Sequence, residues 1–167
     1  FEAASMAERH IISPEFASDN NGSACMISPE EDICIMLNEE DHIRIQVQSC
    51  GMNLPTAFKR DNDIDDYIDS KFTYAFDEKY GYKTTFPSNV GTGLRASYIL
   101  HLPGLSGAKR ISQIGTELGR FGVRLKTLYG DDIGYGNLYQ ISTQKTLGQS
   151  EEEIINDLND IVIPIIN

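Results

Sequence analysis

The chain has 167 residues, enough for one domain with a substantial hydrophobic core. Its formal charge of -11 argues against nonspecific binding to nucleic acids and to anionic membranes, yet it is compatible with a local basic pocket for a nucleotide. Hydrophobic residues make up 40% and charged residues 23%, as in ordinary soluble globular proteins, and no apolar run is long enough to cross a membrane.

The cysteines bear on the cellular location of the protein, and the first residue bears on whether the chain is part of a longer protein. The chain begins with Phe1 instead of methionine, so we expect it to be part of a longer protein, truncated at its N-terminus. Cys25, Cys34 and Cys50 are an odd number and lack the spacing of metal ligands. Cys34 lies in an apolar strand pattern and is expected to be a buried thiol. These features predict a reducing, cytoplasmic location without a structural disulfide.

The first half of the chain predicts a loop, two strands and a helix. Residues 13–24 are rich in turn-forming residues and are expected to form a polar loop. The continuous apolar run 33–37 predicts a buried strand, and the alternation over 43–48 predicts a second strand with Arg44 on its polar face. Apolar residues at helical spacing predict an amphipathic helix over 54–71.

The second half predicts three strands and two helices. The strands cover 94–102, 123–128 and 138–142, and a helix over 105–121 lies between the first two. Ser150 and Glu153 form a capping-box signature before the last helix, whose end Pro164 is expected to disturb. Because there is no repeat and no linker, the sequence predicts a single α+β domain over residues 1–167. Its sheet is expected to be mostly antiparallel and flanked by helices.

An acidic run at the start of the second strand is the most informative feature. Residues 38–46 read Asn-Glu-Glu-Asp-His-Ile-Arg-Ile-Gln. The carboxylates of Glu39, Glu40 and Asp41 repel one another, so a functional cluster needs a cation, a metal or a basic substrate nearby. The alternative is a solvated turn between two strands. Arg44, which follows on the strand, favours the functional interpretation.

Three cations fall on the polar faces of predicted strands, namely Arg44, Arg95 and Lys126. A polyphosphate, with its several oxygens, needs such convergence. The alternative is that each is an exposed cation with its own partner. The run Gly91-Thr92-Gly93 can let backbone N–H groups approach phosphate, but it is equally a common turn.

Carboxylates and cations together suit phosphoryl transfer. Cations and a magnesium ion (Mg2+) neutralise the phosphates, while carboxylates position the acceptor. If the acceptor is a guanidinium, paired glutamates can bind it through two hydrogen bonds and take up its proton as the N–P bond forms.

Several motifs, in order, resemble the ATP:guanido phosphotransferase family. They are NEEDHIRIQ (38–46), PSNVGTGLRAS (87–97), HLPGL (101–105), GNLYQIS (136–142) and LGQSEEEI (147–154). The resemblance runs from about residue 9 to the C-terminus and is closest to the bacterial protein-arginine kinase branch. It implies the guanido kinase or glutamine synthetase-like catalytic fold, an antiparallel sheet flanked by helices. The implied activity is transfer of the γ-phosphoryl group of ATP to protein arginine.

The resemblance also implies roles for single residues. Glu40 would bind the guanidinium and act as the base, Glu39 would help to hold Mg2+ through water, and Asp131 would be a second catalytic carboxylate on the substrate side. The implied partners are ATP and arginine residues of protein substrates, and a homodimer is left open as the oligomeric state.

For ATP, the resemblance implies that Arg44, Arg95 and Lys126 bind the phosphates and that His10 lies near the adenine. Lys126 stands where the family usually has arginine, and it lacks the planar fork of that side chain.

The implied substrate pocket contains Phe86, Ser88 and Asn89. Phe86 stands where the family commonly has cysteine, and Asp131 where it usually has glutamate. Together with Lys126, these departures motivate one alternative, a catalytically impaired relative that binds nucleotide, arginine or phosphoarginine. A small-molecule phosphagen kinase is the other alternative, which the bacterial-type motifs disfavour.

Overall fold

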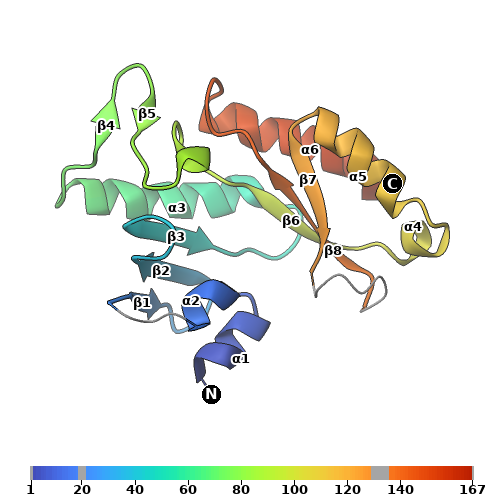
Figure 1. Cartoon of the computed structure of the whole chain (residues 1–167), viewed down its shortest axis with the longest axis horizontal. Coiled ribbons are helices and arrows are strands. Elements are labelled where there is room, and N and C mark those ends of the chain that lie inside the picture. Colours follow the sequence, from blue (N-terminus) through green and yellow to red (C-terminus); the bar gives the residue numbers. More distant parts are fainter. Residues whose placement is uncertain (1, 19–21, 129–135, 167) are drawn as a thin grey trace. The chain divides into compact units, whose positions relative to one another are not determined.

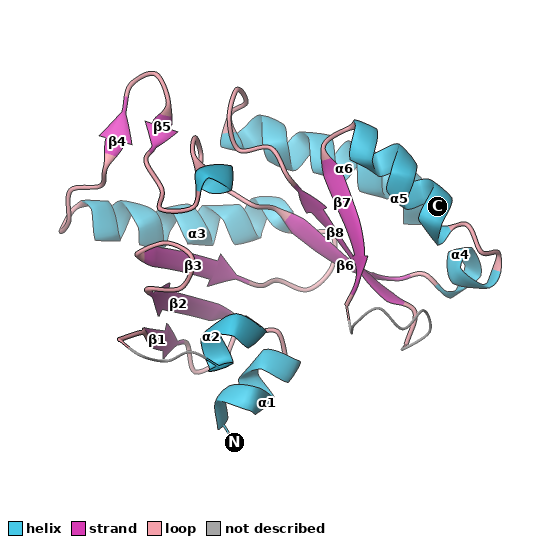
Figure 2. Ribbon diagram, in the orientation of Figure 1, coloured by secondary structure: helices cyan, strands magenta, loops and turns pink. Residues whose placement is uncertain are grey.

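The computed structural model describes residues 2–18, 22–128 and 136–166 (Figure 1). Contacts within the chain define two compact units. Unit 1 comprises Phe1–Phe76 with Thr84–Pro87, and unit 2 comprises Asp77–Lys83 with Ser88–Asn167. Each unit has a three-stranded antiparallel sheet with helices beside it (Figure 2), which confirms the α+β class. The single domain over residues 1–167 stays a prediction.

Unit 1 is built on the sheet β1-β2-β3. Its strands are β1 (Ala24–Ile27), β2 (Ile33–Leu37) and β3 (Ile43–Val47), and its helices are α1 (Glu2–Glu8), α2 (Pro14–Ser18) and α3 (Leu54–Asp69). The expected strands at 33–37 and 43–48 and the expected helix at 54–71 are thereby confirmed. Pro55 occupies the first turn of α3, where its missing N–H costs nothing.

The expectation of a loop over residues 13–24 is wrong in part, because α2 and the start of β1 lie within it. The Ser13 hydroxyl accepts a hydrogen bond from the Phe16 N–H at 3.1 Å and so caps the first turn of α2. The Phe16 side chain is buried. A short helix stabilised by one cap and one buried ring gives little periodic signal in a sequence.

The two faces of this sheet have different partners. The register pairs Cys34 with Gln46 and Met36 with Arg44, so these four side chains share one face. On that face Cys34 and Met36 form a core with residues from the N-terminal segment: Ile11, Ile12 and Phe16. Helix α3 packs against β3. Burial, with Cys25 nearby, raises the pKa of the Cys34 thiol to about 11, so this cysteine is a neutral core residue as expected.

Unit 2 is built on the sheet β6-β8-β7. Its strands are β6 (Ser97–His101), β7 (Val123–Thr127) and β8 (Leu138–Thr143), and its helices are α4 (Pro103–Gly107), α5 (Ile111–Arg120) and α6 (Glu151–Ile166). The short elements β4 (Phe76–Asp77), β5 (Gly81–Tyr82) and the 3-10 turn η1 (Pro87–Asn89) precede this sheet in the chain. Helix α5 packs on β7 and α6 on β8, and the fully buried residues include Tyr139, Ile141, Leu158 and Val162.

Two expectations for this region are wrong. The continuous helix over 105–121 is instead two helices, since Lys109 adopts a left-handed φ of 55° and ends α4. The Arg110 N–H then bonds to the Leu105 carbonyl at 3.0 Å, which satisfies an end of the first helix. Strand β6 starts at Ser97 and not at residue 94, so Arg95 lies before the strand.

The last helix keeps its expected cap. The Ser150 N–H donates to Glu153 Oε2 at 2.8 Å and the Glu153 N–H donates to Ser150 Oγ at 3.3 Å, which confirms the capping box. Helix α6 continues past Pro164 to Ile166, so the proline does not end the helix. Pro164 lies in the last turn, where its missing N–H removes one intrahelical hydrogen bond.

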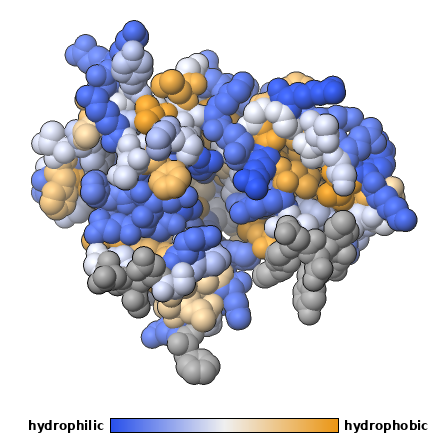
Figure 3. Space-filling view, in the orientation of Figure 1, coloured by the Kyte–Doolittle hydropathy of each residue, from blue (hydrophilic) through white to orange (hydrophobic). Residues whose placement is uncertain are grey.

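Hydrophilic side chains predominate on the face of the molecule that Figure 3 shows, in keeping with a formal charge of -11. Among the described helices, none combines the length and the apolar character that a membrane span requires.

Asp61 in α3 makes the stability of the fold depend on pH. Burial, with a smaller effect of the nearby Asp65 carboxylate, raises the pKa of Asp61 from 3.8 to about 6. Below this range the carboxyl is protonated in both the folded and the unfolded chain, but above it the ionised group destabilises the folded state. Asp61→Asn is therefore expected to raise the free energy of unfolding by about 1–2 kcal/mol at about pH 8 and to change it little at about pH 4.

Urea denaturation across this pH range measures the effect. The exposed Asp63 on the same helix provides the matched control, and Asp63→Asn should have little effect at either pH. A gain from Asp61→Asn that is the same at both ends of the range would contradict the assignment.

Candidate active site

The acidic run forms the turn between β2 and β3 in unit 1. Asn38 has a left-handed φ of 55°, and its N–H bonds to the His42 carbonyl at 3.1 Å, which closes the turn. The three residues between them, Glu39 to Asp41, therefore form the tip of the hairpin. The expectation that they follow one strand and precede the next is confirmed.

Glu39 is the buried carboxylate of this turn. Its Oε2 accepts hydrogen bonds from Arg44 Nη1 and from the Glu40 N–H, each at 2.8 Å, and its Oε1 accepts one from Ser13 Oγ at 2.7 Å. Its side chain is only 5% exposed, whereas that of Arg44 is 39% exposed. Burial alone would raise the pKa of Glu39, but these three donors outweigh it and hold the pKa below its usual value.

Glu40 and Asp41 differ from Glu39 in their surroundings. Glu40 is exposed at the tip of the hairpin. Asp41 Oδ1 accepts a hydrogen bond from the Phe86 N–H at 3.0 Å, and the Phe86 carbonyl accepts one from Thr84 Oγ1 at 2.7 Å. Since the Phe86 side chain is 48% exposed, an apolar ring stands beside the acidic turn. Unit 1 thus brings Glu39, Glu40, Arg44 and Phe86 together.

His10 lies on the side of unit 1 that carries Arg44. Its carbonyl accepts hydrogen bonds from Gln46 Nε2 and Gln48 Nε2, both at 2.8 Å. Gln46 and Gln48 alternate along the chain with Arg44, so His10 is held over the polar face of β3. The role of His10 near an adenine stays a prediction.

Arg95 in unit 2 is oriented by the two residues predicted for the substrate pocket. Its Nε donates to Asn89 Oδ1 at 3.0 Å and its Nη2 donates to Ser88 Oγ at 3.1 Å. Asn89 is buried, with 7% exposure, while Arg95 is exposed. A buried amide therefore fixes an exposed guanidinium in one direction. The contribution of Ser88 and Asn89 to a substrate pocket stays a prediction.

The Gly91-Thr92-Gly93 run packs tightly and does not present free amides at its first two positions. The Gly91 N–H donates to the Tyr82 carbonyl at 3.3 Å, and the Thr92 N–H donates to the Thr146 carbonyl at 2.8 Å. A Cβ atom on Gly91 would lie 2.0 Å from that Thr146 carbonyl oxygen. Glycine is needed here for close backbone approach, so the alternative interpretation as a turn is the better one.

Lys126 is exposed on β7, where the sequence places it on the same face as Arg124. Asp131 lies outside the described residues. Sequence reasoning missed Ser13, which holds Glu39. It named Asp41 as part of the acidic run but missed its hydrogen bond with Phe86. Both contacts join distant residues, and no local pattern signals them.

In the part of the chain that the structure describes, no group of three side chains of the metal-binding types lies together. The role of Glu39 in holding Mg2+ through water stays a prediction.

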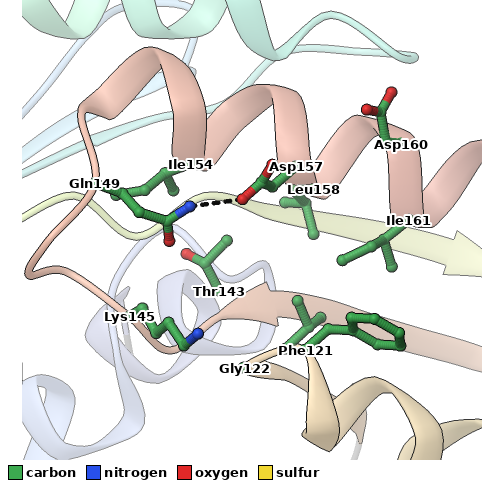
Figure 4. A pocket seen from close by; sticks show the side chains of 11 residues that line it. Phe121, Gly122, Thr143, Lys145, Gln149, Ile154, Asp157, Leu158, Asp160 and Ile161 are labelled. Atoms are coloured by element: carbon green, nitrogen blue, oxygen red, sulfur yellow. Dashed lines mark hydrogen bonds between the residues drawn. The ribbon is translucent and has the colours of Figure 1, made fainter.

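A pocket of about 250 Å³ lies in unit 2 between α6, β8 and the residues that follow β8 (Figure 4). Gln149 Nε2 donates to Asp157 Oδ2 at 2.6 Å on its wall, and Leu158 and Ile161 are among its apolar lining residues. Among its described lining residues Lys145 is the one cation, so the pocket lacks the positive charge that a polyphosphate needs.

Comparison with known proteins gives a consistent result. The family model of the ATP:guanido phosphotransferase C-terminal catalytic domain matches residues 2–167. A protein-arginine kinase from Geobacillus sp. (strain WCH70) is 46% identical over 162 residues, which are 96% of this chain and 45% of that protein. One from Bacillus cereus (strain AH187) is 48% identical, with 96% and 46% covered. The chain therefore spans about half the length of these curated relatives.

Solved structures share the fold. A duplicated taurocyamine kinase from Schistosoma mansoni, with bound transition state analog components, has a TM-score of 0.83 at 23% identity, covering 99% of this chain and 24% of that one. A lombricine kinase has a TM-score of 0.79 at 25% identity, with 98% and 49% covered. Both neighbours support the expected catalytic-domain fold.

Proposed function

Since the chain belongs to the ATP:guanido phosphotransferase family, we propose that it is the catalytic part of a protein-arginine kinase. The reaction moves the γ-phosphoryl group of ATP to a guanidinium nitrogen of a protein arginine. The observation that carries this proposal is the hairpin tip in unit 1. There a buried, ionised Glu39 holds Arg44 while Glu40 lies exposed one residue away.

Glu40 is the proposed guanidinium-binding residue and base. A guanidinium holds its proton too tightly to attack phosphorus, so the proton must leave as the new bond forms. The Glu40 carboxylate takes that proton, the N–P bond forms, and the bond between the γ-phosphorus and the bridging oxygen breaks to release ADP. Asp131 is proposed as a second carboxylate on the substrate side.

Arg44, Arg95 and Lys126 are the proposed phosphate ligands, and His10 is proposed to lie near the adenine. The support for Arg44 and Arg95 is that each guanidinium is already held by an acceptor of its own unit, Glu39 and Asn89 respectively. Side chains fixed in advance lose less entropy when they bind a phosphate. Mg2+ would enter with ATP, and Glu39 would contact it through water.

Phe86, Ser88 and Asn89 are proposed for the substrate side. The exposed ring of Phe86 offers an apolar surface to the aliphatic part of an arginine side chain. We further propose a cytoplasmic protein that acts on protein arginines and forms a homodimer, and that binds neither nucleic acid nor a membrane.

The test uses the full-length protein with Mg-ATP and an arginine-rich protein substrate. Acid-labile phosphate on arginine is expected, and Glu40→Ala is expected to reduce its formation about 1000-fold or more. The matched control is Glu31→Ala, which removes an exposed carboxylate from the same unit. Phosphate transfer that Glu40→Ala leaves unchanged would refute the assigned base.

A specific observation favours the second candidate, a catalytically impaired relative that binds nucleotide. By the resemblance, Phe86, Lys126 and Asp131 stand where the family commonly has cysteine, arginine and glutamate. In the same assay, ATP binding without phosphate transfer would support this candidate. Transfer to free arginine or another small guanidino compound in place of protein would instead support a small-molecule phosphagen kinase.

A further inference from the structure

One face of the sheet in unit 2 carries two cations at neighbouring positions on β7, each in a row of three residues across the sheet. The register places Ser97, Ser142 and Arg124 in one row across the sheet and Ile99, Gln140 and Lys126 in the next. The Gln140 Nε2 donates to Ser97 Oγ at 3.1 Å, as expected for neighbours on one face. We call these six residues the cationic face.

The other face of this sheet is the buried one. Tyr98 and Tyr139 alternate with residues of the cationic face and are buried, and the Tyr98 hydroxyl bonds to Asn159 of α6 at 2.6 Å. Helices α5 and α6 cover that side. The helices of unit 2 therefore leave the cationic face uncovered, and Ile99 on the edge strand β6 is 50% exposed.

Arg124 and Lys126 dominate the charge of this face. Both are exposed, and within the described residues neither forms a salt bridge. No carboxylate belongs to the two rows; the other members are hydroxyl, amide and aliphatic side chains. Two uncompensated cations beside neutral hydrogen-bond donors form a surface that favours an anion.

We propose that Arg124 is a further phosphate-binding residue for ATP, acting beside Lys126. The inference rests on the proposed function. Residues two apart on a strand are about 7 Å apart, so the two cations suit different phosphates of one polyphosphate better than a single phosphate. Arg124 brings to this face the planar fork that Lys126 lacks, and Ser142 lies next to it as a neutral donor.

An exposed cation on an edge strand has a second explanation, since β7 is at the edge of this sheet. Charges there can simply prevent pairing with another chain. The two explanations differ in what they predict for ligands. A phosphate ligand makes affinity depend on the number of phosphates, whereas an edge charge does not.

The experiment measures equilibrium binding of Mg-ATP and of AMP to the full-length protein. Arg124→Ala is expected to weaken Mg-ATP binding about 10-fold to 100-fold and AMP binding less than about twofold, with Arg124→Lys in between. The control is Arg120→Ala, which removes an exposed cation at the end of α5, outside the cationic face, and should change neither affinity. Thermal unfolding verifies that each variant keeps its fold.

Equal losses for Mg-ATP and AMP, or no loss for either, would overturn the role of Arg124. If the wild-type protein binds Mg-ATP and loses it on Arg95→Ala but not on Arg124→Ala, the proposed function stands and this inference fails. If the wild-type protein binds no Mg-ATP, both fail.

Discussion

Glu39→Gln is expected to lower the rate of phosphoryl transfer about 100-fold or more and to raise the KM for ATP. The amide keeps the shape of the side chain but removes the charge that holds Arg44 and offers one acceptor oxygen where two are used. If Arg44 is displaced by about 1 Å, it no longer meets the phosphate that it is proposed to bind, which by itself costs on the order of a hundredfold in rate. Steady-state kinetics of the full-length protein measure both effects.

The same substitution should cost stability as well, about 1–2 kcal/mol, because Glu39 is buried but Arg44 can still reach water. The chain offers a matched control in the ion pair of Arg9 with Glu31, whose two side chains are 47% and 43% exposed. Glu31→Gln is expected to change unfolding by less than about 1 kcal/mol and to leave the rate unaltered. Similar kinetic losses in the two variants would show that the burial of Glu39 has no special role.

Gly91→Ala is expected to destabilise the chain by about 4 kcal/mol or more, the largest effect of any single substitution considered. The new Cβ atom would lie 2.0 Å from the Thr146 carbonyl oxygen and 2.8 Å from its carbon, so backbone must move. That backbone matters beyond packing, because Thr146 Oγ1 donates to the Ser88 carbonyl at 3.1 Å and Ser88 in turn binds Arg95. Urea denaturation measures the loss.

Gly148→Ala separates steric overlap from backbone strain. Gly148 also has a positive φ, +87°, but a Cβ atom there would meet nothing within 4 Å. Its replacement should cost only the strain of a left-handed backbone, about 1 kcal/mol. If Gly91→Ala costs no more than Gly148→Ala, the close approach of residues 91 and 146 does not limit stability.

The sequence predicted the elements whose signal is local and periodic. The apolar run 33–37, the alternation from Ile43 and the helical spacing after Leu54 all correspond to elements of the structure. The break at Lys109 was missed because a left-handed φ at lysine has no sequence signature. Helix α2 was missed because it is short and depends on a cap and a buried ring.

The candidate site divides in the same way. The acidic turn was noticed from the order of the residues alone, since three adjacent carboxylates repel one another unless a cation lies nearby. The direction of each side chain could not be found, because it depends on partners distant in sequence. Arg95 was expected on a strand, yet it lies before β6 and is directed by Asn89. Asp131 lies outside the described residues.

The acidic hairpin also has a consequence for the order in which the chain folds. Its turn closes between Asn38 and His42, a local contact that a short segment can form quickly. Its anchors join residues that are 26 and 45 positions apart in the chain, Ser13 with Glu39 and Asp41 with Phe86. Closing loops of that length costs entropy that only later contacts repay. The hairpin can therefore form before its carboxylates are oriented, and we expect the proposed catalytic arrangement to be completed only after the secondary structure.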